Sequence, residues 1–75
     1  MLPNFYVEYH VYDYRAKKGL TIRDLAEESG VSKSQINDIE NGNKHPTIYT
    51  LCLLSLAFNV SPYELFSIKI RDCPQ

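Results

Sequence analysis

The sequence has no long hydrophobic run, little glycine and no excess of charge of either sign. No uncharged apolar stretch approaches the roughly 18 residues that a transmembrane helix requires. Three Gly and four Pro among 75 residues, with 44% hydrophobic residues, exclude a collagen-like or disordered chain. The first four residues show no basic region followed by an apolar stretch, so we expect no signal peptide.

The charges nearly balance, with eight Lys and Arg residues against nine Asp and Glu residues and a net charge of −1. This balance excludes a strongly basic protein that binds nucleic acid by charge alone, although it permits a locally basic face. The two cysteines, Cys52 and Cys73, form no CxxC pair, so we expect reduced thiols in a cytoplasmic protein.

The sequence also lacks the residue patterns of most enzymes and metal sites. We find no nucleophile–base pattern and no phosphate-cradling glycine loop. His10 and His45 have no metal-ligand spacing to each other or to the cysteines. We therefore expect no enzymatic activity, no catalytic residue, no bound metal and no cofactor.

Seventy-five residues suffice for one domain. We place this domain at residues 1–67 and interpret residues 68–75 as a C-terminal tail. A chain of this size buries only about 60% of its unfolded surface, so association with a partner subunit would add useful stability.

The N-terminal segment, residues 4–18, fits two secondary structures. Val7 and Val11 stand one helical turn apart, and the cations at the end of the segment, followed by a glycine, are typical of a helix C-terminus. Phe5, Val7 and Tyr9 also alternate with polar residues, and Tyr and Val favour strands. The termination signal favours a helix, with a strand as the alternative.

Cap residues indicate four further helices. Ser32 with Gln35 three residues later forms a capping box, and Thr21 with Asp24 approaches that pattern. The expected helices lie at residues 21–29, 32–41, 47–58 and 61–66. The core is expected to contain the apolar residues of their inner faces: Ile22, Leu25, Ala26, Ile36, Ile39, Ile48, Leu51, Cys52, Leu54, Phe58, Leu65 and Phe66.

A short turn containing Gly30 joins the helices at residues 21–29 and 32–41, which is the signature of a helix-turn-helix. Gly30 permits a positive φ, and the small Ala26 allows the two helices to approach closely. An α-helix fits the major groove of DNA, where polar side chains read base edges. The outer face of the second helix carries five such side chains: Lys33, Ser34, Gln35, Asn37 and Asp38.

The order and spacing of these residues resemble the Cro/phage-repressor (XRE-type) helix-turn-helix family. The matching residues include Arg15, Lys18, Gly19, Leu20, Thr21, Leu25, Ala26, Gly30, Val31, Ser32, Ile36, Ile39, Glu40, Asn41, Gly42, Pro46, Thr47, Leu51, Ala57, Val60, Ser61, Glu64, Leu65 and Phe66. The resemblance implies an all-α fold, a compact five-helix lambda-repressor-like domain with a central helix-turn-helix. It also implies a helix rather than a strand at the N-terminus and makes the helix at residues 32–41 the recognition helix.

The resemblance assigns the five outer-face residues to base reading, chiefly those of the first turn. It places Thr21, Asn43 and Lys44 at or beside positions that contact DNA phosphates. Arg15 and Glu40 fall where several relatives have a buried ion pair. Such a pair would orient the recognition helix more than it would stabilise it.

Two features depart from the family pattern. Ile22 occupies a position that is often polar, and Asp38 places a carboxylate on the reading face, where it would accept from cytosine N4 but repel a nearby phosphate. Few basic residues flank the motif. Phosphate contacts would then contribute modestly to affinity, which makes dimerisation more necessary.

The helix at residues 47–58 carries more apolar residues than its core face needs. Tyr49, Leu53 and Leu56 repeat with helical spacing on a second face, and Tyr63 stands where the family usually has an acidic residue. Apolar patches of this kind mark interfaces, so we predict a dimer or partner interface here. The alternative is that the C-terminal tail folds back over the patch.

The sequence therefore indicates a sequence-specific DNA-binding transcriptional regulator of bacterial or phage type. We expect a homodimer that binds double-stranded DNA at a pseudo-palindromic operator and represses transcription. The alternative is an antitoxin- or antirepressor-like module that binds a protein partner through the apolar patch. No membrane partner is expected.

Overall fold

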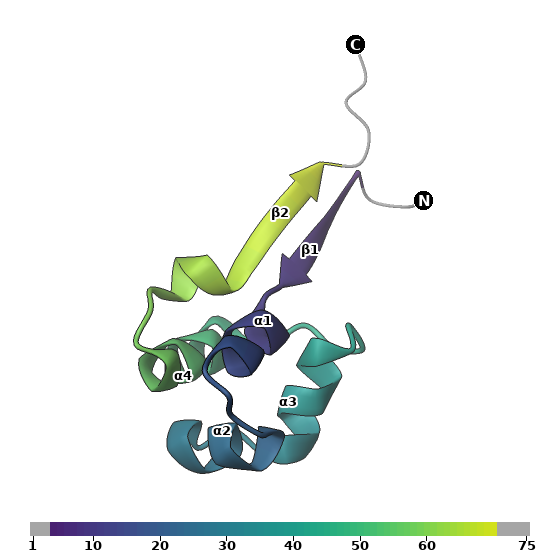
Figure 1. Cartoon of the computed structure of the whole chain (residues 1–75). Helices are drawn as coiled ribbons and strands as arrows, with labels where there is room; N and C mark the ends of the chain where they lie inside the picture. The colour runs from purple at the N-terminus through teal and green to yellow at the C-terminus, as the bar shows by residue number, and fades with distance from the viewer. Residues whose placement is uncertain (1–3, 71–75) are drawn as a thin grey trace.

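Helices pack into a body from which a two-stranded β-ribbon projects (Figure 1). The computed structural model describes residues 4–70 of the chain. Within these residues, no helix has the length and apolar character needed to cross a membrane. The elements in chain order are β1 (Phe5–Tyr9), α1 (Val11–Lys17), α2 (Ile22–Ser29), α3 (Lys33–Glu40), α4 (Ile48–Phe58), the 3-10 helix η1 (Pro62–Leu65) and β2 (Phe66–Ile70).

The N-terminal segment is not one helix, so the expectation of an all-α domain with five helices is wrong in this part. β1 occupies Phe5–Tyr9, and α1 begins only at Val11. β1 pairs antiparallel with β2, in a register that places Val7 opposite Ile68. The backbone N–H and C=O groups of β1 thus form their hydrogen bonds with β2, at the far end of the described chain. The spacing of apolar residues within the N-terminal segment cannot reveal this pairing. The expected fifth helix is the short 3-10 helix η1.

The expected C-terminal tail overlaps β2. The boundary proposed at residue 68 falls inside this strand, because β2 continues to Ile70. Residues 71–75, which include Cys73, lie outside the described residues. β2 pairs with β1 and does not fold back over α4, so this part of the tail leaves the predicted patch on α4 uncovered.

Side-chain caps begin the helices close to their expected positions. Thr21 Oγ1 accepts from the backbone nitrogen of Asp24 at 3.0 Å, and the Asp24 carboxylate accepts from the Thr21 nitrogen at 3.1 Å, which completes a capping box. Ser32 caps α3 through the nitrogen of Gln35 at 3.1 Å. The expected return bond to Ser32 is replaced, because the Gln35 side chain donates to Thr50 Oγ1 on α4 at 3.3 Å.

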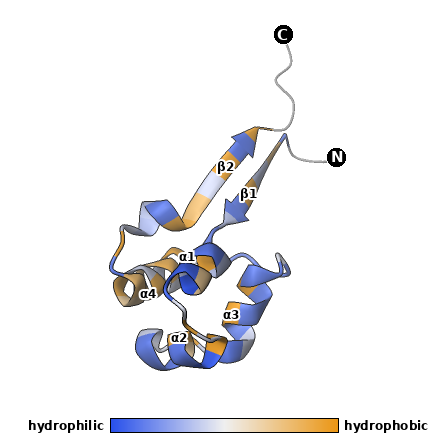
Figure 2. Cartoon of the chain, viewed as in Figure 1, coloured by the Kyte–Doolittle hydropathy of each residue, from blue (hydrophilic) through white to orange (hydrophobic). Residues whose placement is uncertain are grey.

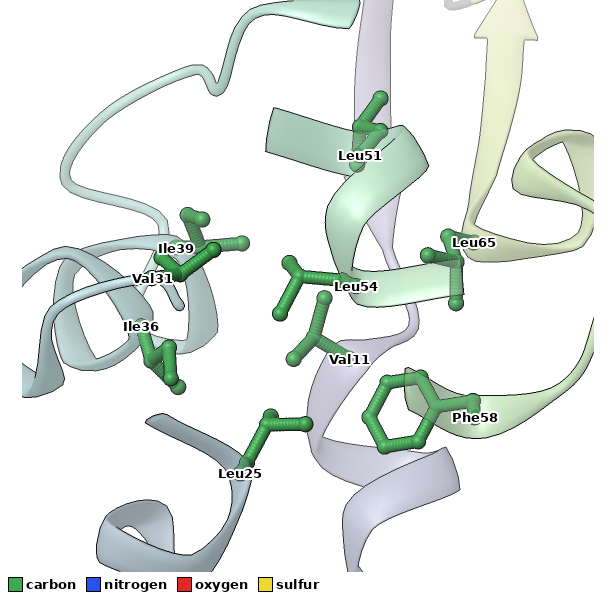
Figure 3. Close-up of a cluster of buried hydrophobic side chains, with 9 residues drawn as sticks. All are labelled: Val11, Leu25, Val31, Ile36, Ile39, Leu51, Leu54, Phe58 and Leu65. Atoms are coloured by element: carbon green, nitrogen blue, oxygen red, sulfur yellow. The ribbon is translucent and has the colours of Figure 1, made fainter. Parts of the chain in front are cut away.

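The core lies where the four α-helices and η1 converge (Figure 3). Each fully buried Leu, Ile, Val or Phe contributes about 1.5–3 kcal/mol relative to an exposed side chain, so this cluster is the main favourable term for folding. The prediction that Ile48 belongs to the core is wrong, since 78% of its surface is exposed, and Cys52 is half-buried. The buried apolar residues are Val11, Leu25, Val31, Ile36, Ile39, Leu51, Leu54, Phe58 and Leu65.

Candidate nucleic-acid interface

α2 and α3 form a helix-turn-helix whose angle is fixed by packing and by one buried hydroxyl. Gly30 ends α2 with φ of +80°, a left-handed conformation that glycine adopts without strain. Val31 and Ile36 then pack against Leu25 in the core. Ser29, which the sequence pattern did not single out, is buried, and its Oγ accepts from the Val31 nitrogen at 3.1 Å. The turn therefore holds α3 rigidly against α2.

The outer face of α3 is exposed and polar along its length. Lys33 and Ser34 lie exposed in its first turn, and Asn37 lies exposed one turn further on. Asn37 Oδ1 accepts from the side-chain amide of Asn41 at 3.3 Å, which leaves the Asn37 amide group as a donor toward solvent. The three side chains thus present hydrogen-bonding groups on a helix of the size that the major groove admits.

Gln35, a predicted base-reading residue, is oriented by α4. Its amide nitrogen donates to Thr50 Oγ1 at 3.3 Å, while Thr47 and Thr50 share a hydroxyl contact at 3.0 Å. This bond occupies part of the Gln35 amide and leaves its oxygen as a free acceptor. No local sequence pattern indicates this contact, because Thr50 lies 15 residues further along the chain.

Asp38 and Lys44 lie close to each other, although the resemblance assigned them different contacts. Lys44 Nζ lies 3.8 Å from Asp38 Oδ2, and the Lys44 side chain remains 73% exposed. Asn43, which is exposed beside it, donates its backbone nitrogen to the Asp38 carbonyl at 2.9 Å. The lysine partly neutralises this carboxylate on α3, so Asp38 would repel an approaching anion less than it would alone.

The predicted ion pair between Arg15 and Glu40 is present as a bidentate contact. Arg15 Nε and Nη2 donate to the two Glu40 carboxylate oxygens at 2.7 and 2.9 Å, and Nη1 donates to the Leu20 carbonyl at 3.0 Å. The side chains are only 15% and 7% exposed. The Glu40 hydrogen bond raises the pKa of Arg15 above its ordinary value. The pair ties the last turn of α3 to α1 and so fixes the direction of the outer face.

The N-terminus of α2 lies on the same helix-turn-helix unit. Thr21 is exposed there, at the position that the resemblance assigns to a DNA phosphate. Its capping partner Asp24 has a pKa below the ordinary value, chiefly because the Thr21 backbone N–H donates to the carboxylate. This carboxylate stabilises the positive end of the helix dipole, but it also opposes a phosphate approaching the same end.

The loop between α3 and α4 is connected to the ribbon. The Tyr9 hydroxyl and His45 Nδ1 form a hydrogen bond of 2.9 Å, and the two rings lie 5.8 Å apart. His45, for which the sequence predicted no metal-binding role, therefore joins β1 to the loop that carries Asn43 and Lys44. The two residues are 36 positions apart, so no sequence spacing indicated the contact.

The predicted interface residues do not all share one environment. Tyr49, Leu56 and Tyr63 leave 73%, 78% and 79% of their surface exposed. Leu53, by contrast, is half-buried against the core. Figure 2 shows hydrophobic colour along most of α4, whereas α2 and α3 are largely hydrophilic. The chain thus has a polar surface on the helix-turn-helix and an apolar surface on α4.

Comparisons with known proteins agree with this geometry. The curated relative SlrR of Bacillus subtilis, an HTH-type transcriptional regulator, is 44% identical over 57 residues; these cover 75% of this chain and 38% of SlrR. A structure of SinR, the master regulator for biofilm formation, in complex with DNA superposes with a TM-score of 0.69 at 34% identity, over 72% of this chain and 87% of that one. A structure of the SinR–SinI protein complex gives a TM-score of 0.70 at 34% identity, over 73% of this chain and 54% of that one.

The chain spans well under half the length of SlrR, so the likeness concerns the part of that regulator that aligns with it. A family model described as helix-turn-helix matches residues 11–65, which run from the start of α1 to the end of η1. This match includes every helix of the described structure and leaves the ribbon strands outside it. The chain belongs to the helix-turn-helix family.

Proposed function

We propose that this chain is a sequence-specific DNA-binding transcriptional regulator that acts as a homodimer on a pseudo-palindromic operator and represses transcription. The observation that carries the proposal is the exposed polar outer face of α3, held in one direction by the core and by the contact between Arg15 and Glu40. The family match and the DNA-bound structure of SinR support the same function. Such a regulator acts in the cytoplasm, where bacterial and phage DNA is transcribed.

In this proposal, α3 enters the major groove, and its first turn faces the base edges. Lys33 donates to guanine O6 or N7, and the Asn37 amide is suited to adenine. Gln35, with its nitrogen engaged by Thr50, offers its oxygen as an acceptor to adenine N6 or cytosine N4. Ser34 reads either kind of base edge, and Asp38 accepts from cytosine N4.

The phosphate contacts are assigned to groups that flank α3. Lys44 gives up its 3.8 Å contact with Asp38 when a phosphate approaches, because the lysine is largely exposed and flexible. Thr21 and Asn43, which are exposed and uncharged, position the backbone by hydrogen bonds. With so few cations in each copy, two copies on one operator are needed for tight binding.

The direct test is retention of DNA fragments by the purified protein. Wild-type protein is expected to retain a discrete subset of fragments from a library of bacterial upstream DNA. The double variant K33A/N37A should lose this retention with an unchanged circular dichroism spectrum. The variant K17A removes the same charge from an exposed site on α1 and serves as the matched control. Equal retention by K33A/N37A and wild type would show that α3 does not read DNA.

A second candidate function is an antitoxin- or antirepressor-like module that binds another protein. The observation that favours it is the exposed apolar surface at Tyr49, Leu56 and Tyr63. The structure of SinR with SinI shows that a family member forms a complex with another protein. Salt separates the two functions, because a DNA-binding regulator loses affinity for DNA steeply with salt, whereas a protein-binding module binds DNA weakly at every salt concentration.

A further inference from the structure

Apolar residues occupy both the inner and the outer side of α4, and its two polar residues other than tyrosine, Thr50 and Ser55, are buried. Its inner side packs Leu51, Leu54 and Phe58 into the core. Its outer side exposes Ile48 and Leu56, each by 78%. A helix that is hydrophobic on all sides is normally covered on all sides, yet nothing within residues 4–70 covers the outer side of this one.

The ribbon has one apolar face as well. Successive residues of a strand point to opposite sides, so the cross-strand pairs alternate between the two faces of the ribbon. One face carries Glu8 and Lys69, which lie 4.0 Å apart. The other face consists of three apolar pairs: Phe5 with Ile70, Val7 with Ile68, and Tyr9 with Phe66. Ile68 and Ile70 remain 60% and 64% exposed on that face.

The apolar side of the ribbon is continuous with the outer side of α4. A groove of about 340 Å³ lies between them and is lined by residues of both, among them Ile48 and Cys52 of α4, Tyr63 of η1, and Val7 and Ile68 of the ribbon. We define the apolar face as the large exposed apolar side chains of α4, η1 and the apolar side of the ribbon, which leaves out the exposed Tyr6 on the other side of the ribbon and Tyr12 on α1. Its residues are Phe5, Ile48, Tyr49, Leu56, Tyr63, Ile68 and Ile70.

We propose that a second copy of this chain covers the apolar face, so that the ribbon and α4 together form the dimer interface. The proposal rests on the homodimer proposed above and identifies its surface. It extends the interface expected from α4 alone, because it adds the ribbon, which the helix-turn-helix family match does not include.

The exposed area fits a dimer. The seven residues of the apolar face leave 48–79% of their surface exposed, which at about 200 Å² for a large side chain amounts to on the order of 900 Å². A stable dimer buries about 800 Å² on each partner. A solitary two-stranded ribbon is also marginally stable in water, so packing against a second ribbon would stabilise it.

The charged pair of the ribbon lies away from the proposed interface. A two-fold interface is self-complementary, and only residues at the axis meet their own equivalents, so an apolar surface can pack against its own copy. The charged pair of the ribbon, Glu8 and Lys69, points to its other side and so stays in solvent when the apolar face is covered.

The proposed interface leaves the DNA-reading face free. In Figure 1 the ribbon rises from the side of the helical body that is remote from α2. The Tyr9–His45 hydrogen bond, at 2.9 Å, runs from the ribbon to the loop after α3. Dimer contacts on the ribbon therefore set the position of this loop directly.

The test is the oligomeric state of the full chain, measured by sedimentation velocity over a range of concentrations. Wild-type protein is expected to sediment as a dimer. The variant I48K/I68K places a charge on each side of the groove and should sediment as a monomer with an unchanged circular dichroism spectrum. The matched control is E8K, which adds a lysine to the opposite face of the same ribbon and should remain dimeric.

The milder variant I68T keeps a β-branched residue in β2 and guards against misfolding of the charged variant. It should raise the dimer dissociation constant at least tenfold. A monomeric wild-type protein, a dimeric I48K/I68K, or an unchanged dissociation constant for I68T would overturn the proposal. The α3 variant K33A/N37A should remain a dimer, so loss of DNA binding and loss of dimerisation are distinguished by separate variants.

Discussion

Arg15 and Glu40 illustrate how single residues position α3. Their contact joins α1 to the last turn of α3 with two hydrogen bonds of 2.7 and 2.9 Å, nearly out of solvent. Paired charges in such a place stabilise little, because desolvation offsets most of their attraction. Removing one partner leaves the other as an uncompensated buried charge, which is strongly unfavourable. The pair therefore specifies the direction of α3 more than it raises stability.

Replacing Glu40 alone should show this asymmetry. E40A leaves the Arg15 guanidinium without its carboxylate and should lower the free energy of unfolding by about 3 kcal/mol. The double variant R15M/E40M should recover most of that loss. Urea denaturation measures both. The control R23A breaks the exposed contact of Arg23 with Glu27, which should cost less than about 1 kcal/mol. An E40A protein as stable as R23A would contradict the assigned role.

The capping carboxylate of α2 makes stability depend on pH. The pKa of Asp24 is lowered in the folded protein, so its contribution is complete above the unfolded-state pKa and is lost as the pH falls through the lower folded-state value. The stability difference between wild type and D24N should therefore shrink as the pH falls below about 4. Thermal unfolding at pH 7 and pH 3 measures this difference. An equal difference at both pH values would exclude a capping charge.

At the level of elements, the boundaries of α2, α3 and α4 followed from the sequence to within one or two residues, because caps such as Thr21 and Thr47 act locally. The ribbon could not be predicted from local sequence, because β1 is stabilised by pairing with β2 at the other end of the described chain. The side of α4 that faces the core was also ambiguous in the sequence, because apolar residues occur on all sides of this helix. Helical periodicity therefore could not exclude Ile48 from the core, although it is exposed in the structure.

In the candidate site, too, locally determined features could be predicted from the sequence and contacts between separate elements could not. The outer face of α3 could be identified from its caps and spacing, because side-chain direction on a helix follows the sequence. The contacts that orient the site, from Gln35 to Thr50 and from Tyr9 to His45, join separate elements. Such contacts depend on the tertiary fold, so no local pattern predicted them.

The turn between α2 and α3 provides a test of whether the left-handed backbone conformation of Gly30 is needed for stability. G30A places a side chain at φ of +80°, where residues with a Cβ are strained by about 1–2 kcal/mol. Nothing lies within 4 Å of the added Cβ, so the effect should come from the backbone alone. Chemical denaturation should show this loss, whereas E28A, at an exposed α2 site, should be nearly neutral. A neutral G30A would mean that the turn relaxes without strain.

At the scale of the whole molecule, two surfaces have separate proposed roles. The polar face of α3 is assigned to DNA, and the apolar face to a second copy. Because the net charge is −1, affinity for DNA depends on a few local cations rather than on overall attraction. A dimer places two such faces on one side of DNA, about 34 Å apart. Under this proposal a single copy would offer few phosphate contacts, so tight binding to DNA would require both surfaces.

The salt dependence of operator binding should reflect this small number of cations. If Lys33 and Lys44 of both copies meet phosphates or bases, the slope of log affinity against log salt should be roughly −3 to −4. K44A should flatten the slope by about 2, because each copy loses one phosphate contact. Fluorescence anisotropy between 50 and 200 mM salt measures these slopes. A slope unchanged in K44A would remove Lys44 from the interface.

The most direct test of the account is the base specificity of an α3 variant. Affinities of wild type and N37A are measured for the retained operator and for versions with each base pair of one half-site replaced. If α3 reads DNA, N37A loses discrimination at one position, by about 1–3 kcal/mol, and keeps it at the others. If N37A and K33A both discriminate among all positions as wild type does, α3 is not the helix that reads DNA.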